Sequence, residues 1–568
     1  MNPRIPYNPK KRRGTAAAQG EPEGLGCARY LWLVMPLVAV SFVWVWRSRA
    51  AGGEALSAPT VTVVTEAPTQ ALATLTPAPL EATDAPSVEP TLALVSLTPA
   101  PPTAELSTGV PTLIALPTST LPPEPSPSPT AIMTPAGTLL YETQSGDTLA
   151  TLAARFGVNP VDIQLASGTG GLGAGLLAHG QLLVIPNILG DTGPGYHMLP
   201  DSEVVFSGAA AGFDPQEYAA QRGGYLAEYV GYADDRARPG GDVLLVAARD
   251  HSINPRLLMA LLEYLSGWVL NPSPEGDALR YPYRYEHLYL TNLNSQLTWA
   301  TSQLAIGYYG WRDGSLTEIH FRDGTSLRLD PSLNAGTVAV QHFLAQVFDR
   351  ADWEVAVSPE GFANTYRALF GDPAARALDP LLPADLVQAP MGLPYPVGST
   401  WYLSGGPHGA WELGGAQAAL DFAPGAVVGG CAPSSAWVTA VAAGVVLRAA
   451  NGAVVVDLDG DGREATGWVV LYLHIATEGR VAEGTLVERG QRIGHPSCEG
   501  GRSTGTHVHI ARKYNGEWIP AYGAVPFDMS GWVAGQGKGE YYGTLTRNGV
   551  TVEACTCTAA WTGVRHEQ

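Results

Sequence analysis

The sequence predicts a multidomain chain with an N-terminal transmembrane helix, a small α+β domain, a mainly α-helical middle domain and an all-β antiparallel C-terminal domain. Three observations predict this fold class. One long apolar run lies near the N-terminus, a Pro-rich stretch separates it from the rest, and the hydrophobic period changes from helical to alternating near residue 390. A length of 568 residues allows several domains. The formal net charge of −19 argues against nucleic acid as a partner.

The N-terminal element, residues 1–50, is predicted to be a cytoplasmic tail and a transmembrane signal anchor. Residues 30–46, YLWLVMPLVAVSFVWVW, form an uncharged apolar run at the short end of the membrane-spanning range. Only Arg47 and Arg49 follow it closely, whereas more basic residues precede it: Arg4, Lys10, Lys11, Arg12, Arg13 and Arg29. This bias predicts a single-pass protein of the cell membrane, with its C-terminal bulk outside the cytoplasm or in the cell wall. A cleaved signal peptide is the competing interpretation, but WRSR stands where small residues are expected.

Residues 51–136 are predicted to be a disordered tether rich in Pro, Thr and Ala. They contain 17 prolines and neither lysine nor arginine. No helical or strand period survives at that proline density.

Order is predicted to resume in a small domain at residues 137–190. A short strand leads into SGDT, where Ser145 or Asp147 can cap a helix, and VNPVDIQLA indicates a second short helix before the strand GQLLVIP. The GDTL, FGV and GQLLVIP segments resemble a LysM domain. That resemblance implies binding of N-acetylglucosamine-containing glycans such as peptidoglycan. The Gly-rich loop ASGTGGLGAGLLAHG is longer than is usual, so a LysM fold without glycan binding remains the alternative.

Residues 197–388 are predicted to be mainly helical. Asn254 and Pro255 open a helix in SINPRLLMALLEYLSGWV, and two further helices follow in NSQLTWATSQLAIGYYGWRDG and LNAGTVAVQHFLAQVFD. The first helix resembles that of the lysozyme-like lytic transglycosylases, which carry a catalytic Glu immediately before Ser-Gly. Leu265 stands at that position and cannot donate a proton, while Glu263 would face another side of the helix. We therefore expect a non-catalytic lysozyme-like domain, with an unrelated helical spacer as the alternative.

Residues 390–560 alternate short Val-rich runs with Gly, Asn and Asp turns, which predicts antiparallel strands. This region also concentrates polar side chains that bind metals: His408, Asp421, His474, His507 and His509. In THVHIARK the two histidines are two residues apart, so their rings lie on one face of a strand. Zn²⁺ binds imidazole and carboxylate well, and a catalytic site uses three protein ligands and an open position.

These motifs resemble the beta-lytic and lysostaphin-like zinc endopeptidases, which cut the peptide part of bacterial cell walls. The resemblance implies that His408, Asp421 and His509 are the metal ligands. It makes His474 and His507 the catalytic pair that orients water and stabilises the oxyanion. The 13-residue spacing from His408 to Asp421 is that of the beta-lytic branch, which contains staphylolysin.

The expected function is therefore that of a membrane-anchored zinc metalloendopeptidase, targeted to peptidoglycan, that hydrolyses peptide cross-links with a metal-activated water. LysM would bind the glycan strands, and the peptidase domain would bind the peptide stems. The alternative is a non-catalytic cell-wall-binding scaffold with an inactive peptidase-like domain.

Two further features of the C-terminal region need an interpretation. Its four cysteines predict two disulfides with three possible pairings. We favour Cys431–Cys498, with either a strained short loop between Cys555 and Cys557 or a mixed pairing for these two. The stretch DLDGDGRE begins like a calcium loop, but Trp468 occupies the twelfth position, and a hairpin turn is expected instead. His251 and His495 are expected to be ordinary polar residues.

Overall fold

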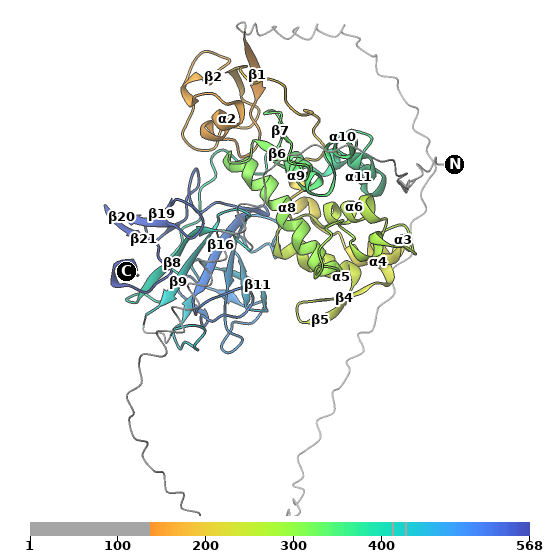
Figure 1. Cartoon of the computed structure of the whole chain (residues 1–568). Coiled ribbons are helices and arrows are strands. Elements are labelled where there is room, and N and C mark those ends of the chain that lie inside the picture. Colours follow the sequence, from red (N-terminus) through yellow and green to blue (C-terminus); the bar gives the residue numbers. More distant parts are fainter. Residues whose placement is uncertain (1–136, 412–413, 426–428, 568) are drawn as a thin grey trace, which may run out of the picture. The chain divides into compact units, whose positions relative to one another are not determined.

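A computed structural model describes residues 137–411, 414–425 and 429–567 (Figure 1). The expected membrane span and tether lie outside these residues. In the described part of the chain, no helix combines the length and apolar character needed to cross a membrane. The described residues form the expected small α+β, helical and β-rich regions in order along the sequence.

The small N-terminal region is a three-stranded sheet with one α-helix. Strand β1 (Thr138–Glu142) pairs with β3 (Leu182–Pro186), which pairs in turn with β2 (Gln164–Leu165). Helix α2 (Leu149–Phe156) packs its apolar face on this sheet and ends at Gly157, which has the left-handed conformation that favours glycine.

Two details of this region differ from the prediction. The N-cap of α2 is Thr148, which forms a capping box with Thr151, while the Asp147 carboxylate binds Arg155 and the Tyr141 hydroxyl instead. The expected second helix is only a 3₁₀ turn, η1 (Pro160–Asp162). The chain becomes extended at Ile163, because Gln164 and Leu165 pair with β3. Pairing in the sheet thus outweighs the weak helical pattern of VNPVDIQLA.

The middle region is built from helices around one apolar core. Its helices are α3 (Pro215–Arg222), α4 (Tyr225–Glu228), α5 (Gly240–Asp250), α6 (Pro255–Ser266), α7 (Asp277–Arg280), α8 (Leu293–Asp313), α9 (Ala335–Val347), α10 (Arg350–Ala356) and α11 (Phe362–Phe370). Short hairpins join them: β4 (Val230–Ala233) with β5 (Arg236–Pro239), and β6 (Glu318–His320) with β7 (Ser326–Arg328).

Helix α6 begins as the sequence predicts, since the Asn254 side chain accepts a hydrogen bond from the Arg256 backbone N–H. At its other end, the Glu263 carboxylate accepts hydrogen bonds from the backbone N–H groups of Val269 and Leu270, each at 3.0 Å. Glu263 therefore closes the turn after its own helix.

His342 on α9 gives this helical core a pH dependence. Its ring is largely buried, and neither ring nitrogen has a hydrogen-bond partner among the described residues. Burial, followed by the neighbouring His320, lowers the pKa of His342 to about 4. The unfolded chain, with an ordinary histidine pKa near 6.5, therefore binds more protons than the folded chain between these two values.

We expect the stability provided by neutral His342 to be fully present above about pH 6.5. It should fall as the pH drops towards 4, by about 3 kcal/mol of unfolding free energy. Denaturant unfolding of the wild-type protein and of His342→Leu, measured across this range, tests the expectation. In His342→Leu, the unfolding free energy should no longer fall with pH by this amount. Substitution of the exposed His287 should leave the pH dependence unchanged. Identical slopes for wild type and His342→Leu would contradict the assignment.

The C-terminal region contains a nine-stranded antiparallel sheet with the order β14-β11-β12-β13-β16-β9-β8-β22, in which β17 also pairs with β16. Its strands are β8 (Thr400–His408), β9 (Ala419–Pro424), β11 (Gly444–Ala450), β12 (Ala453–Asp457), β13 (Trp468–Leu473), β14 (Leu486–Val487), β16 (Val508–Tyr514), β17 (Glu517–Trp518) and β22 (Gly563–Arg565). A second sheet joins β18 (Asp528–Met529), β19 (Trp532–Gln536), β20 (Gly543–Arg547) and β21 (Val550–Glu553), and a short pair joins β10 (Val438–Thr439) with β15 (Arg492–Gly494).

Both faces of the large sheet are buried at its centre. One face, with Val454, Val456 and Val470, forms the core of the C-terminal region. The other face, with Val455 and Leu471, belongs to the same apolar core as the helices of the middle region. An antiparallel sheet commonly leaves one face in water, so the uninterrupted apolar runs of β12 and β13 reflect this second layer.

Ion pairs also connect the helical region to the sheet. Arg312 on α8 forms ion pairs with Asp201 at 3.0 Å and with Glu517 of β17 at 2.9 Å, and all three side chains are at most 10% exposed. A second link joins Arg448 of β11 to Asp250 of α5 at 2.6 Å. The helical region and the sheet are therefore joined by buried and half-buried ion pairs as well as by apolar packing.

Candidate metal centre

Three neighbouring strands of the large sheet bring together the residues that the sequence singles out. His408 ends β8, Asp421 lies in β9, and His509 is the second residue of β16. Asp421 is directly opposite His509 in the register of β9 and β16, so their side chains lie on the same face. All three residues are buried.

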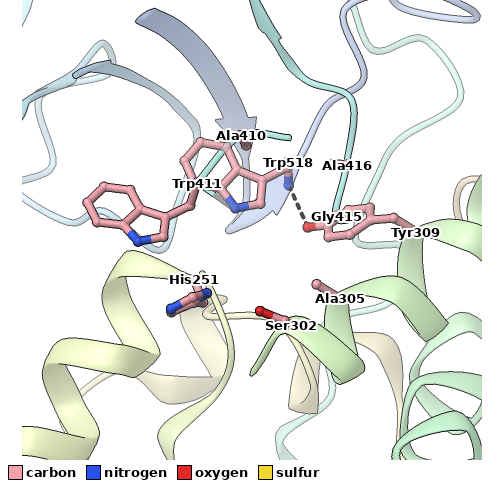
Figure 2. A pocket seen from close by; sticks show the side chains of 9 residues that line it. All are labelled: His251, Ser302, Ala305, Tyr309, Ala410, Trp411, Gly415, Ala416 and Trp518. Atoms are coloured by element: carbon pink, nitrogen blue, oxygen red, sulfur yellow. Dashed lines mark hydrogen bonds between the residues drawn. The ribbon is translucent and has the colours of Figure 1, made fainter. Parts of the chain in front are cut away.

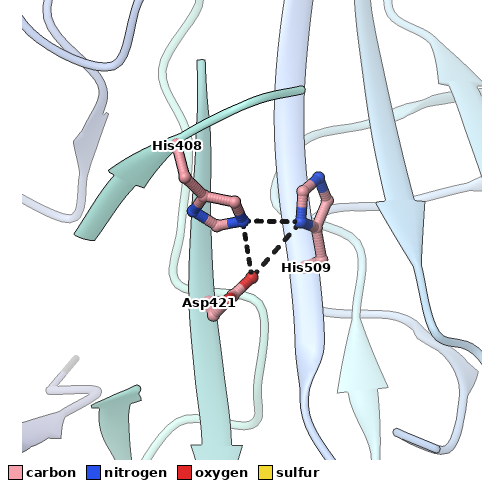
Figure 3. Close-up of side chains that lie close together, drawn as sticks. All are labelled: His408, Asp421 and His509. Carbon is pink, nitrogen blue, oxygen red and sulfur yellow. Dashed lines mark hydrogen bonds and ion pairs between the residues drawn. The ribbon is translucent and has the colours of Figure 1, made fainter. Parts of the chain in front are cut away.

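The donor atoms of these residues form a small triangle (Figure 3). His408 Nε2 is 3.0 Å from His509 Nδ1 and 3.4 Å from Asp421 Oδ1, and the third side, from His509 Nδ1 to Asp421 Oδ1, is 3.3 Å. A tetrahedral zinc ion with bonds of about 2.0–2.1 Å has ligand atoms about 3.3–3.4 Å apart. The donor set and its spacing therefore fit zinc.

Hydrogen bonds from the far side of each imidazole fix which nitrogen faces the centre. His408 Nδ1 is 2.8 Å from the Gly406 carbonyl, and His509 Nε2 is 2.8 Å from the Ala410 carbonyl. A carbonyl can only accept, so these nitrogens carry the proton, and the opposite nitrogens are free to coordinate. Among the described residues, the buried Asp421 Oδ1 has no conventional hydrogen-bond partner, as expected of an atom that coordinates a metal.

His474 and His507 lie beside this triangle. Their ring centroids are 4.6 Å apart, and His507 Nε2 is 3.6 Å from Asp421 Oδ1. His474 follows β13, and His507 immediately precedes β16. Their Nδ1 atoms lie within hydrogen-bond distance of the Glu499 and Gly505 carbonyls, which makes Nδ1 a donor on both rings and leaves Nε2 available for proton transfer.

The burial of the site alters the proton affinities of its groups. Burial, and then the neighbouring His507 and His509, lower the pKa of His474 to about 4, so this imidazole is neutral at neutral pH. Burial alone would raise the pKa of Asp421, but His408 and His507 hold it well below its ordinary value. The centre therefore combines one carboxylate with a neutral imidazole at His474.

The chain between β8 and β9 connects the centre to the helical region. Ala410, whose carbonyl holds His509, lines a small pocket with Trp411 and Trp518 (Figure 2). The helical region supplies the opposite wall, and the Tyr309 hydroxyl there accepts a hydrogen bond from the Trp518 backbone N–H at 3.0 Å. One wall of this pocket is thus formed by α8.

Sequence reasoning missed Tyr541, whose ring stacks on His408 with the centroids 4.2 Å apart and the planes at 19°. It also missed Glu499, whose backbone carbonyl holds His474. Neither is part of a metal-binding motif. Tyr541 lies more than a hundred residues after His408, and a backbone carbonyl leaves no mark in a sequence, so only the fold reveals these contacts.

The remaining candidates lie outside the triangle. His495 packs on Trp437, and His251 lines the pocket described above. The DLDGDGRE stretch connects β12 to β13, as expected of a turn between strands. Asp457, Asp459 and Asp461 cluster there, and Asp457 accepts hydrogen bonds from the backbone of its own loop.

The cysteines form two disulfides. Cys431–Cys498 is the pairing favoured from the sequence, and Cys555–Cys557 is the second.

Three known domain families match successive parts of the chain. Residues 141–186 match the LysM domain, residues 197–384 the LasA N-terminal domain, and residues 428–520 peptidase family M23. The last range includes His474, His507 and His509, whereas His408 and Asp421 precede it. The middle region is thus matched as a LasA N-terminal domain, and its relation to lysozyme stays a prediction.

Several known proteins are similar to this chain. Protease LasA from two strains of Pseudomonas aeruginosa is 28% identical over 291 residues, which is 48% of this chain and 66% of each relative, just under two thirds of their length. The solved structure of the M23 metalloprotease pseudoalterin is 27% identical and covers 30% of this chain and 96% of its own, with a TM-score of 0.25. The catalytic domain of lysostaphin from Staphylococcus simulans is 23% identical and covers 22% of this chain and 87% of its own, with a TM-score of 0.16. The chain therefore contains a LysM domain, a LasA N-terminal domain and a domain of peptidase family M23.

Proposed function

We propose that the chain is a zinc metalloendopeptidase that hydrolyses the peptide cross-links of peptidoglycan. The observation that carries this proposal is the triangle of His408 Nε2, Asp421 Oδ1 and His509 Nδ1, whose sides of 3.0–3.4 Å suit one tetrahedral ion. The M23 family match and the similarity to protease LasA support a peptidase.

His408, Asp421 and His509 would hold the ion, with the backbone carbonyls of Gly406 and Ala410 keeping the two imidazoles in the coordinating tautomer. Bound zinc supplies a Lewis acid, which makes water a usable nucleophile near neutral pH and polarises the scissile carbonyl.

His474 and His507 would handle the protons. His507 Nε2 lies 3.6 Å from Asp421 Oδ1, and the His474 ring lies next to His507, with the centroids 4.6 Å apart. The lowered pKa keeps His474 neutral, so its Nε2 lone pair can accept a proton. A histidine in this place can hold that proton and deliver it to the leaving amine. His507, when it carries a proton on Nε2, can then donate a hydrogen bond to the oxygen on which negative charge develops.

The regions outside the M23 domain would bring the enzyme to peptidoglycan and hold it at the cell membrane. The LysM match supports binding of the glycan strands of peptidoglycan. The apolar run at residues 30–46 supports a single-pass anchor, and the two disulfides support an oxidising location for the C-terminal domains outside the cytoplasm.

Removal of the metal should abolish the activity reversibly. The purified full chain should contain one zinc per molecule by elemental analysis, lose hydrolysis of purified peptidoglycan when treated with a chelator, and regain it on addition of zinc. Hydrolysis of a cross-link releases new amino groups without new reducing sugar ends, so both products should be measured.

The same experiment distinguishes the scaffold alternative. A chain that binds peptidoglycan but takes up no zinc under zinc-replete conditions, and releases no amino groups, would be a non-catalytic cell-wall-binding scaffold. New reducing ends in place of amino groups would contradict a peptidase.

A further inference from the structure

A short segment between β15 and β16, Ser497–Glu499, contacts both histidines of the proposed catalytic pair. The Ser497 backbone N–H and hydroxyl both donate to the His474 carbonyl, at 2.7 and 3.0 Å. The Glu499 carbonyl accepts the hydrogen bond from His474 Nδ1 at 2.9 Å. On its other side, Ser497 forms an isolated antiparallel bridge with His507.

These contacts act on a residue whose backbone needs support. His474 has a φ of 63°, in the left-handed region that is unfavourable for a residue with a side chain. The two hydrogen bonds from Ser497 to its carbonyl hold the peptide in that conformation. The bond from Nδ1 to the Glu499 carbonyl then selects the tautomer and helps to hold the ring with its centroid 4.6 Å from that of His507.

The side chain of Glu499 fixes this segment to the loop that follows His474. Its carboxylate accepts hydrogen bonds from the Thr477 backbone N–H at 2.9 Å, from the Thr477 hydroxyl at 2.6 Å and from Arg480 at 3.0 Å. Arg480 also donates to the Ala476 carbonyl at 3.1 Å. The position of the Glu499 carbonyl, and hence of the His474 ring, therefore depends on the hydrogen bonds of the Glu499 carboxylate.

The disulfide completes the support on the side of His507. Cys498, in the middle of the segment, is bonded to Cys431. The chain around Cys431 binds Thr506, which directly precedes His507: the Gly430 carbonyl accepts the Thr506 backbone N–H at 3.0 Å, and the Ala432 carbonyl accepts its hydroxyl at 2.6 Å. The metal triangle is supported differently, through carbonyls of Gly406 and Ala410 on the opposite side of the site.

We propose that Ser497–Glu499, anchored by Cys431–Cys498, is a positioning element for His474 and His507 that acts separately from metal binding. This inference rests on the proposed function. Glu499, which touches neither the metal ligands' donor atoms nor the proposed reacting atoms, is a positioning residue for turnover.

Replacing Glu499 with alanine tests the proposal in the full chain. We expect Glu499→Ala to keep one zinc per molecule and to lower kcat by about 10–100-fold, the range seen when a supporting hydrogen bond of a site residue is lost. Glu499→Gln keeps one acceptor for Thr477, so its kcat should fall less than that of Glu499→Ala. Glu478→Ala removes the same charge from an exposed position in the same loop and should leave kcat unchanged.

Two further measurements separate positioning from a general loss of structure. In a His474→Ala background, Glu499→Ala should cause no additional loss of kcat, because the ring that it positions is absent. Nitrogen NMR of the histidine-labelled protein should show His474 protonated at Nδ1 in the wild type and a mixture of tautomers in Glu499→Ala. Replacing both Cys431 and Cys498 with serine should likewise lower kcat while zinc is retained.

A loss of zinc in Glu499→Ala, an unchanged kcat, or losses that multiply in the His474→Ala background would each overturn the proposal. The NMR measurement does not depend on activity. A wild-type chain without hydrolytic activity would therefore refute the proposed function, whereas an unchanged His474 tautomer in Glu499→Ala would refute the positioning role.

Discussion

His509→Ala is expected to remove zinc and peptidoglycan hydrolysis together, whereas His507→Ala should keep zinc and lose turnover by about 10²–10⁴-fold, the usual contribution of one acid–base group. The reason is geometric. His509 Nδ1 forms one corner of the triangle with His408 and Asp421, while His507 lies beside the triangle with Nε2 3.6 Å from Asp421 Oδ1.

Zinc content by elemental analysis and kcat on purified peptidoglycan, measured on the same preparations, check this division. His495→Ala is a suitable control, because its ring packs on Trp437 outside the triangle, and it should keep both zinc and turnover. A zinc-free His507→Ala together with a zinc-loaded His509→Ala would reverse the two assignments.

Arg312→Met should lower the free energy of unfolding by about 3–5 kcal/mol, because it leaves two buried carboxylates without their cation. Arg312 pairs with Asp201 and Glu517, and its side chain is only 8% exposed. It also binds the Ser145 carbonyl of the small N-terminal region. The loss should therefore affect the helical region, the sheet and the LysM domain together.

Denaturant unfolding provides the measurement, and the chain offers a matched control. Arg350 pairs with Glu354 on the surface, where their side chains are 45% and 57% exposed, so Arg350→Met should cost less than about 1 kcal/mol. Adding Glu517→Met to Arg312→Met removes one of the stranded carboxylates and should recover part of the loss. Equal effects of the two single variants would show that burial does not strengthen the Arg312 pairs.

The sequence predicted most strongly what depends on local patterns. Asn254 followed by Pro255 predicted the start of α6, and the spacing of His507 and His509 correctly indicated two rings on one side of the sheet. The prediction of a second helix in the LysM domain was wrong because that segment depends on a distant partner. Its residues follow a weak helical pattern, but Gln164 and Leu165 gain more by pairing with β3, a partner that lies almost twenty residues away.

In the candidate site, too, contacts between residues far apart in the sequence were not predicted. The concentration of histidines and a carboxylate in one region indicated a metal site, and the resemblance to the beta-lytic endopeptidases singled out His408, Asp421 and His509 as its expected ligands. The groups that orient them are backbone carbonyls and a stacked ring, such as Ala410 and Tyr541, and these gain their role only from the closure of the sheet. The supporting half of a site is therefore much harder to predict than the ligands themselves.

The second buried face of the large sheet has a consequence for how this protein can be dissected. Val455, Leu471 and Trp518 are almost fully buried in the core that they share with the helices. Burial of each such side chain is worth about 1.5–3 kcal/mol. A fragment cut from the chain near residue 390 would place this surface in water and would be prone to self-association. The M23 domain of this chain is therefore not expected to fold as a separate module, and moving it into another protein would require residues 197–567 as one piece.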